Sequence, residues 1–133
     1  MIKKSKLVMV DVSATILHHG HIRLLKKASK LGRVVVALTS DEEVKRNKGY
    51  MPELNYSQRK EILNSLIYVH KVVKSKWLIT NDFVSKNKID ILIRGSDYKN
   101  QKIFKKTIIF PRTKGISSSL IRNKIFNRLN KFR

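Results

Sequence analysis

The chain has 133 residues, with 30 Lys or Arg against 9 Asp or Glu, and a formal net charge of +21. This length fits one domain with its own core, so we expect a single domain over residues 1–133. The absence of Cys excludes a disulfide framework and a zinc ribbon. No apolar run is long enough to span a bilayer, and the basic N-terminus lacks a signal peptide's apolar region, so we expect a cytoplasmic protein.

The excess of positive charge would attract polyanions such as nucleic acid, anionic lipid and nucleoside triphosphates. Lys, Asn and Ile are frequent throughout the chain, which indicates a general compositional bias. Aromatic residues do not alternate with the basic ones, as a platform for stacking bases would require. We therefore expect no specific nucleic-acid binding, and any non-specific binding should fall steeply with salt.

The first half of the chain predicts a strand, a helix and a second strand. Residues Leu7–Val12 are apolar on both faces, which is typical of a buried parallel strand. An amphipathic pattern from about Gly20 to Leu31 predicts a helix, with Gly32 placed to end it. Residues Arg33–Leu38 form a second buried strand, so the segment is a βαβ unit with a right-handed crossover.

The rest of the chain continues the alternation. Ser40 is a plausible helix cap, with acidic residues in the turn that follows. Residues Lys45–Pro52 are interpreted as a basic loop, and Ser57 as the start of the next helix. Further elements are a strand at 71–73, a helix at 82–88, strands at 89–94 and 107–110, and a helix at 117–128. Apolar strands alternating with helices predict a three-layer α/β domain with a parallel sheet.

The turn between the first strand and the first helix carries the sequence Leu17-His18-His19-Gly20-His21. Unpaired N–H groups and the positive end of the dipole favour an anion there, and Gly20 permits a close approach to the backbone. His18 and His21 are neighbours in the first turn and can donate to one phosphate. Two other interpretations stay open: a zinc site, which would need ligands beyond the remaining His70, and a solvated helix start without a ligand.

A second motif lies near the C-terminus, Pro111-Arg112-Thr113-Lys114-Gly115-Ile116-Ser117-Ser118-Ser119, with serines placed to cap the last helix and meet a phosphate. The first motif has the form His-x-Gly-His, and the second Arg-Thr-x-Gly-Ile-Ser-Ser/Thr. Together, and in this order, they resemble the signatures of the small nucleotidyltransferases, most closely the cytidylyltransferases of the glycerol-phosphate type. The resemblance spans roughly residues 6–125 and is specific for the family, not for the substrate.

The resemblance implies a Rossmann-like sheet of five parallel strands in the order 3-2-1-4-5, and a homodimer. It also implies transfer of CMP from CTP to a small phosphorylated alcohol with release of pyrophosphate, and Mg²⁺ bound with the triphosphate. No metal ligand is expected from the protein itself. The positions that match catalytic residues are His18, His21, Lys48 and Arg112. The positions that match nucleotide-binding residues are Ser13, Gly20, Lys45, Gly95, Asp97, Thr113, Ile116, Ser117 and Ser118.

The chain departs from the family pattern in three places. The family's Gly-Thr-Phe-Asp is Val12-Ser13-Ala14-Thr15, its Arg-Tyr-Val-Asp is Ile67-Tyr68-Val69-His70, and its Gly-Asp-Asp-Trp is Gly95-Ser96-Asp97-Tyr98. The phosphate-handling positions match, whereas those near the base and the acceptor do not. Two alternatives therefore stay open: an adenylyltransferase acting on a sugar phosphate, whose Gly-x-Asp-Tyr pattern is similar, and a non-catalytic module that binds nucleotide or nucleic acid.

Overall fold

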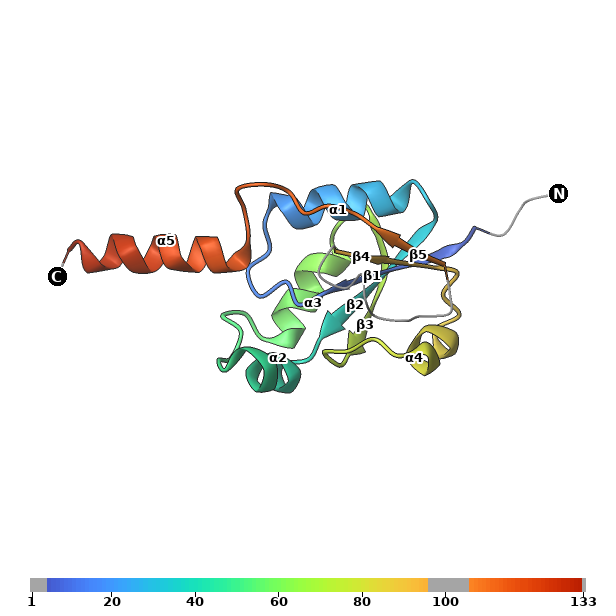
Figure 1. Ribbon diagram of the computed structural model, residues 1–133, viewed down its shortest axis with the longest axis horizontal. Coiled ribbons are helices and arrows are strands. Elements are labelled where there is room, and N and C mark those ends of the chain that lie inside the picture. Colours follow the sequence, from blue (N-terminus) through green and yellow to red (C-terminus); the bar gives the residue numbers. More distant parts are fainter. Residues whose placement is uncertain (1–4, 96–105, 133) are drawn as a thin grey trace.

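A five-stranded parallel sheet forms the centre of the computed structural model, which describes residues 5–95 and 106–132. Its strands are β1 (Leu7–Val12), β2 (Arg33–Thr39), β3 (Val69–Ser75), β4 (Ile91–Arg94) and β5 (Lys106–Ile109). They lie in the order β3-β2-β1-β4-β5, and every neighbouring pair is parallel (Figure 1). The fold class and the strand order predicted from the sequence are confirmed.

Helices lie on both faces of this sheet, except the last one, which projects away from it. They are α1 (His19–Ser29), α2 (Asp41–Lys48), α3 (Tyr56–Asn64), α4 (Asn81–Lys86) and α5 (Ser118–Asn130). Alternate residues of β1 enter two different cores: Val8 and Val10 pack with residues of α1 and α3, and Met9 packs with residues of α4. Because all three are fully buried, β1 is the central strand that the apolar run predicts.

Two predictions about where helices end were wrong. Helix α2 continues through Lys45 to Lys48 and ends at Gly49, in the left-handed region (φ 83°), where we predicted a loop beginning at Lys45. Its acidic first turn and basic last turn both match the helix dipole. Gly32 does not end α1, because Lys30 is the cap; instead, a Cβ on Gly32 would lie 2.3 Å from the Lys6 carbonyl oxygen. The other predicted boundaries are correct to within two residues, and those of β1 are matched in full.

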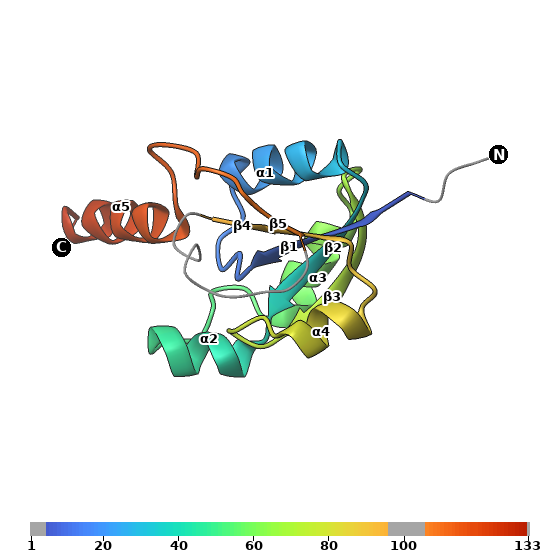
Figure 2. The same cartoon turned by 45° about the vertical axis from the view of Figure 1, so that its right-hand side comes forward.

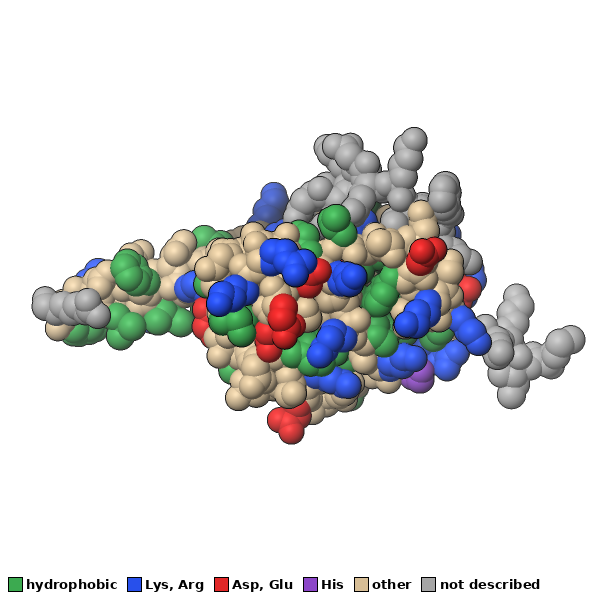
Figure 3. Space-filling view, turned by 90° about the horizontal axis from the view of Figure 1, so that it is seen from below, with side chains coloured by type: hydrophobic (Ala, Val, Ile, Leu, Met, Phe, Trp, Pro, Cys, Tyr) green, Lys and Arg blue, Asp and Glu red, His purple; other side chains and the backbone are tan. Residues whose placement is uncertain are grey.

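Helix α5 projects from the body of the protein, as Figures 1 and 2 show from two directions. Within the described residues 106–132, no residue of this helix is buried, and its large apolar side chains Ile125, Phe126 and Leu129 are exposed. In the described part of the chain, no helix is long and apolar enough to cross a membrane. Lys and Arg side chains lie scattered among apolar and acidic ones on the face seen in Figure 3.

Arg59, on α3, holds together the carboxyl ends of β1 and β2. Its side chain, only 1% exposed, donates to the carbonyl oxygens of Ser13 (2.7 Å) and Thr39 (2.9 Å), which follow β1 and end β2. It also donates to the Leu54 carbonyl (3.1 Å) and to a carboxylate oxygen of Asp41 (2.7 Å). One buried guanidinium therefore joins four segments that meet at this edge.

Arg59→Ala should destabilise the protein strongly, because it leaves buried carbonyls and the Asp41 carboxylate without their donor. We expect a loss of about 3–5 kcal/mol in the free energy of unfolding, measured by urea denaturation. The control is Arg46→Ala, which removes the contact of the exposed Arg46 with the partly buried Glu43 (3.2 Å) and should cost less than about 1 kcal/mol. Equal losses in the two variants would contradict the role given to Arg59.

Candidate active site

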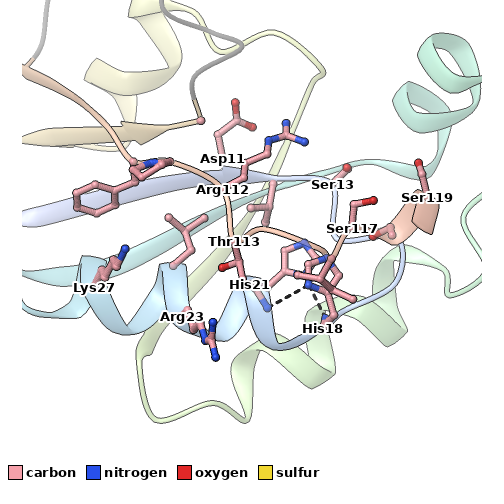
Figure 4. Close-up of a pocket in the computed structure, with 18 of the residues that line it drawn as sticks. Asp11, Ser13, His18, His21, Arg23, Lys27, Arg112, Thr113, Ser117 and Ser119 are labelled. Carbon is pink, nitrogen blue, oxygen red and sulfur yellow. Dashed lines mark hydrogen bonds between the residues drawn. The ribbon is translucent and has the colours of Figure 1, made fainter. Parts of the chain in front are cut away.

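A cavity of about 380 Å³ opens at the carboxyl end of β1 (Figure 4). Its walls are the β1–α1 turn, the start of α1, the end of α2 and the segment between β5 and α5. This volume lies within the range of small-molecule sites. The predicted site residues that line it are Ser13, His18, Gly20, His21, Lys48, Gly95, Arg112, Thr113, Ile116, Ser117 and Ser118.

Two histidines close the start of α1 by capping each other's backbone. The Gly20 N–H donates to Nδ1 of His18 (3.1 Å), and the His18 N–H donates to Nδ1 of His21 (3.1 Å). A nitrogen that accepts a hydrogen bond carries no proton, so the neutral ring carries its proton on Nε2. Both rings are therefore fixed as Nε2–H donors, with their centroids 4.0 Å apart.

The surroundings keep both rings neutral. Burial first, and then the nearby charges of His18, Arg112 and Lys48, together lower the pKa of His21 to about 4. Burial also lowers the pKa of His18, with a smaller contribution from the charge of His19. The site thus combines neutral N–H donors with permanent cations, a combination suited to an anion rich in oxygen atoms.

Gly20 is required by the packing of the histidine turn. A Cβ at this position would lie 2.9 Å from the His18 ring and 3.3 Å from the side chain of Ile116. A larger residue would therefore push the His18 ring away from its hydrogen bond or displace the second motif. From the sequence, we expected Gly20 to let a ligand approach the backbone closely. The structure adds a second reason, the close packing of the His18 ring and Ile116 around this position.

The second motif is joined directly to the first. The Ser118 hydroxyl donates to the Ile16 carbonyl (2.9 Å) and accepts from the Ile16 N–H (3.2 Å) across 102 positions of sequence. Ser117 is the cap of α5, and its side chain accepts from the Leu120 N–H (3.0 Å). The two serines predicted to meet a phosphate thus also fix the helix start beside the histidine turn.

Among the described residues, one predicted site residue, Lys45, is not brought to the cavity. Lys48, the last residue of α2, lines it with its Nζ 5.9 Å from the centre of the Trp77 ring. Lys45 is exposed and does not line it, because α2 continues through both lysines and sets Lys45 about 4.5 Å back along the axis. Asp97 lies outside the described residues.

Asp11 is a cavity residue that the sequence analysis missed. It is the one acid among the described residues that line the cavity, and it pairs with the buried Arg94 at 3.2 Å. Burial raises the pKa of Asp11 to about 6, while the charge and hydrogen bond of Arg94 act in the opposite direction. The available signal was a carboxylate inside an otherwise apolar strand. Trp77 and Phe110, which also line the cavity, had no comparable signal.

A parallel α/β domain with the His-x-Gly-His turn and the Arg-Thr-x-Gly-Ile-Ser segment at one cavity is that of a nucleotidyltransferase. A family model described as Cytidylyltransferase-like matches residues 13–124. The glycerol-3-phosphate cytidylyltransferase of Staphylococcus aureus (strain NCTC 8325 / PS 47) is 36% identical over 121 residues, covering 85% of this chain and 89% of that protein. The enzyme of the same name from Bacillus subtilis (strain 168) is 33% identical, covering 83% and 89%. The chain belongs to the cytidylyltransferase-like family.

Two further relatives extend the comparison. The bifunctional protein HldE of Haemophilus ducreyi (strain 35000HP / ATCC 700724) is 38% identical over 100 residues, which cover 74% of this chain and 21% of that longer protein. The solved lipopolysaccharide core biosynthesis protein of Thermoplasma volcanium GSS1 has a TM-score of 0.68 and 26% identity. It covers 82% of this chain and 98% of that one. Both results agree with the family assignment.

The low pKa of His21 should appear as a dependence of stability on pH. Between about pH 6.5 and 4, the unfolded chain binds a proton at this residue that the folded protein excludes, so stability falls as pH falls through this window. In His21→Gln this contribution disappears, while a Gln oxygen can still accept the His18 N–H, as in a common capping box. The wild type should therefore lose up to roughly 3 kcal/mol more than the variant between pH 7 and 4.

The measurement is urea denaturation of both proteins at a series of pH values. His18 is present in both, so the difference between the two curves reports on His21. Parallel curves of unfolding free energy against pH would show that burial does not hold the His21 ring neutral.

Proposed function

We propose that the protein transfers CMP from CTP to a small phosphorylated alcohol resembling glycerol phosphate, with release of pyrophosphate. The observation that carries the transfer chemistry is the mutual cap of His18 and His21, which presents two neutral N–H donors in a cavity shared with Arg112 and Lys48. The choice of CTP and of the acceptor is supported by the two near-full-length relatives named glycerol-3-phosphate cytidylyltransferase.

The reaction needs no nucleophile from the protein. An oxygen of the acceptor's ionised phosphate attacks the α-phosphorus of the triphosphate, and the bond from that phosphorus to the oxygen bridging it to the β-phosphate breaks. The electron pair leaves with pyrophosphate. Catalysis therefore depends on in-line positioning and on stabilising the negative charge that shifts between phosphate oxygens.

The proposed roles follow the positions of the cavity residues. His18 and His21 donate from Nε2 to α- and β-phosphate oxygens, where donors fixed in advance are most effective. Arg112 offers a planar fork to the β- and γ-phosphates, and Lys48 adds a point charge from the end of α2. Ser117 and the first N–H groups of α5 hold the same end of the triphosphate. The remaining predicted nucleotide contacts in the cavity are Ser13, Gly95, Thr113 and Ile116.

Mg²⁺ accompanies the triphosphate in this proposal and neutralises part of its charge. In residues 5–95 and 106–132, no three His, Asp or Glu side chains cluster as an all-protein metal site would need. Mg²⁺ in such sites is held largely by substrate phosphates and water, with one or two carboxylates. Asp11 already pairs with Arg94, so we assign no protein ligand to the ion.

An adenylyltransferase acting on a sugar phosphate is the second candidate. It is favoured by the sequence Arg94-Gly95-Ser96-Asp97-Tyr98, in which Gly-x-Asp-Tyr follows a basic residue. The experiment that separates the candidates is pyrophosphate release with CTP or ATP, each with a panel of phosphorylated alcohols and sugar phosphates. Turnover with CTP and glycerol phosphate supports the first candidate, and turnover only with ATP and a sugar phosphate supports the second.

The same assay tests the mechanism through the three histidines. His18→Ala and His21→Ala should each lower turnover by about 10²–10³, because each removes a donor aimed at the shifting charge. His19→Ala is the matched control, since His19 is exposed and does not line the cavity. Equal small effects in all three variants, or no release with any acceptor, would contradict the transferase and favour a non-catalytic binding module.

We also propose the homodimer that the resemblance implies. The exposed apolar side chains of α5, among them Ile125, Phe126 and Leu129, support it, because a second copy would remove them from water. Light scattering should give a dimer mass at physiological salt and a greater monomer share at low salt, where the charge of +21 repels. A monomer mass at every salt concentration would contradict the proposal.

A further inference from the structure

Beyond the hydrogen bonds of Ser118 to Ile16, helix α5 is joined to the body by Arg122 in its second turn. The guanidinium of Arg122 donates to both carboxylate oxygens of Glu53, from Nε (2.7 Å) and from Nη2 (2.6 Å). Nη2 also donates to the hydroxyl of the buried Thr15 (3.3 Å), and the guanidinium carbon lies 4.4 Å from the centre of the Tyr50 ring. We call these four residues the clasp.

The clasp joins three segments that each carry predicted site residues. Thr15 belongs to the turn that leads to His18, Tyr50 and Glu53 follow Lys48, and Arg122 follows Ser117 on α5. None of the four clasp residues is among the described residues that line the cavity. Any effect on the site must therefore pass through the residues that the clasp holds.

Lys48 is the site residue whose following loop carries Tyr50 and Glu53. It ends α2, and Gly49 reverses the chain immediately after it. The following loop is tied at its far end by Arg59, which donates to the Leu54 carbonyl (3.1 Å). At its near end the described contacts are those of Tyr50 and Glu53 with Arg122. The clasp thus fixes the part of the loop that leaves Lys48.

Charge connects the same residues. The pKa of Lys48 is lowered first by burial and then by the charges of Arg122 and Arg112, while Glu53 acts in the opposite direction. Glu53 is the acid named among the charges that shift this pKa, and it opposes the effects of Arg122 and Arg112 on Lys48. The Glu53 carboxylate therefore offsets the repulsion that would push Lys48 away from the cavity.

The clasp contributes little to the overall stability of the fold. The side chains of Arg122 and Glu53 are 25% and 42% exposed, and ion pairs in such settings are typically worth about 0–1 kcal/mol. The two hydrogen bonds to Glu53, with the Tyr50 ring and the Thr15 hydroxyl as further contacts, instead fix the orientation of the Arg122 guanidinium. Because its loss should barely change the stability of the protein, an effect of the clasp on ligand binding can be measured separately.

We propose that Arg122 is a positioning residue, which through Glu53 and Tyr50 holds Lys48 over the cavity for the triphosphate. The proposal rests on the proposed function only in taking a nucleoside triphosphate as the ligand. It also accounts for one departure from the family pattern, because Thr15 stands where the family has a carboxylate. Here the Arg122 guanidinium binds Thr15 and takes its carboxylate partner, Glu53, from a different segment.

The test is a pair of double-variant cycles, with calorimetric titration of CTP and of ATP, each with Mg²⁺ and without acceptor. Arg122→Ala and Lys48→Ala should each weaken binding about tenfold, the size of one lost charge-assisted contact. The double variant should bind no more weakly than Lys48→Ala alone, because Arg122 acts through Lys48. The matched control is Arg128→Ala, an exposed arginine on the same helix beyond the clasp, which should leave affinity unchanged in either background.

Melting temperatures of all variants accompany the titrations and should stay close to that of the wild type. The proposal is overturned if Arg122→Ala binds nucleotide as tightly as Arg128→Ala. It is also overturned if the fold-losses of affinity in Arg122→Ala and Lys48→Ala multiply in the double variant, as they would for independent contacts. Binding that depends on Arg122 in a protein that releases no pyrophosphate would support the clasp and reject the proposed function. Turnover with no dependence on Arg122 would do the reverse, and a wild type that binds neither nucleotide would count against both.

Discussion

The rest of the site depends on the hydrogen bonds that His18 and His21 make to the first turn of α1. A helix start leaves backbone N–H groups without partners, and side chains usually supply the acceptors. Here the acceptors are two imidazole nitrogens, so the bonds that close the helix also decide which nitrogen of each ring carries the proton. Folding of the helix start and preparation of the donors are the same event.

Arg59 supplies hydrogen-bond donors to the segments that meet at the carboxyl end of the sheet. Three of its four hydrogen bonds go to backbone carbonyls of Ser13, Thr39 and Leu54, and only one goes to a carboxylate. The edge is therefore tied together without adding acids that would cancel the positive field of the cavity. The turn that Arg59 supports has a strained backbone, because Ala14, next to Ser13, is buried and adopts a positive φ of 46°.

The sequence predicted the features that local pattern controls. The apolar run of β1 predicted its strand, and the resemblance supplied the strand order and the roles of His18, His21 and the second motif. The loop predicted from Lys45 failed because Gly49 and Pro52 were given more weight than the acidic start and basic end of α2. Asp11 was visible as an acid in an apolar strand, but its partner Arg94 is 83 positions away. The clasp was beyond reach for the same reason, since Arg122 meets Glu53 across 69 positions and Thr15 across 107.

The bonds between Ser118 and Ile16 have a consequence for how the protein is made. During synthesis the histidine turn and strands β1 to β5 are made before the second motif, and the first βαβ unit can begin to pair early. The wall formed by Arg112, Thr113 and Ser117 arrives last, when Ser118 reaches back across 102 positions. A chain interrupted before Arg112 keeps the histidine cap and all five strands yet lacks one wall of the cavity. The segment translated after the five strands therefore completes the site around a sheet that is already assembling.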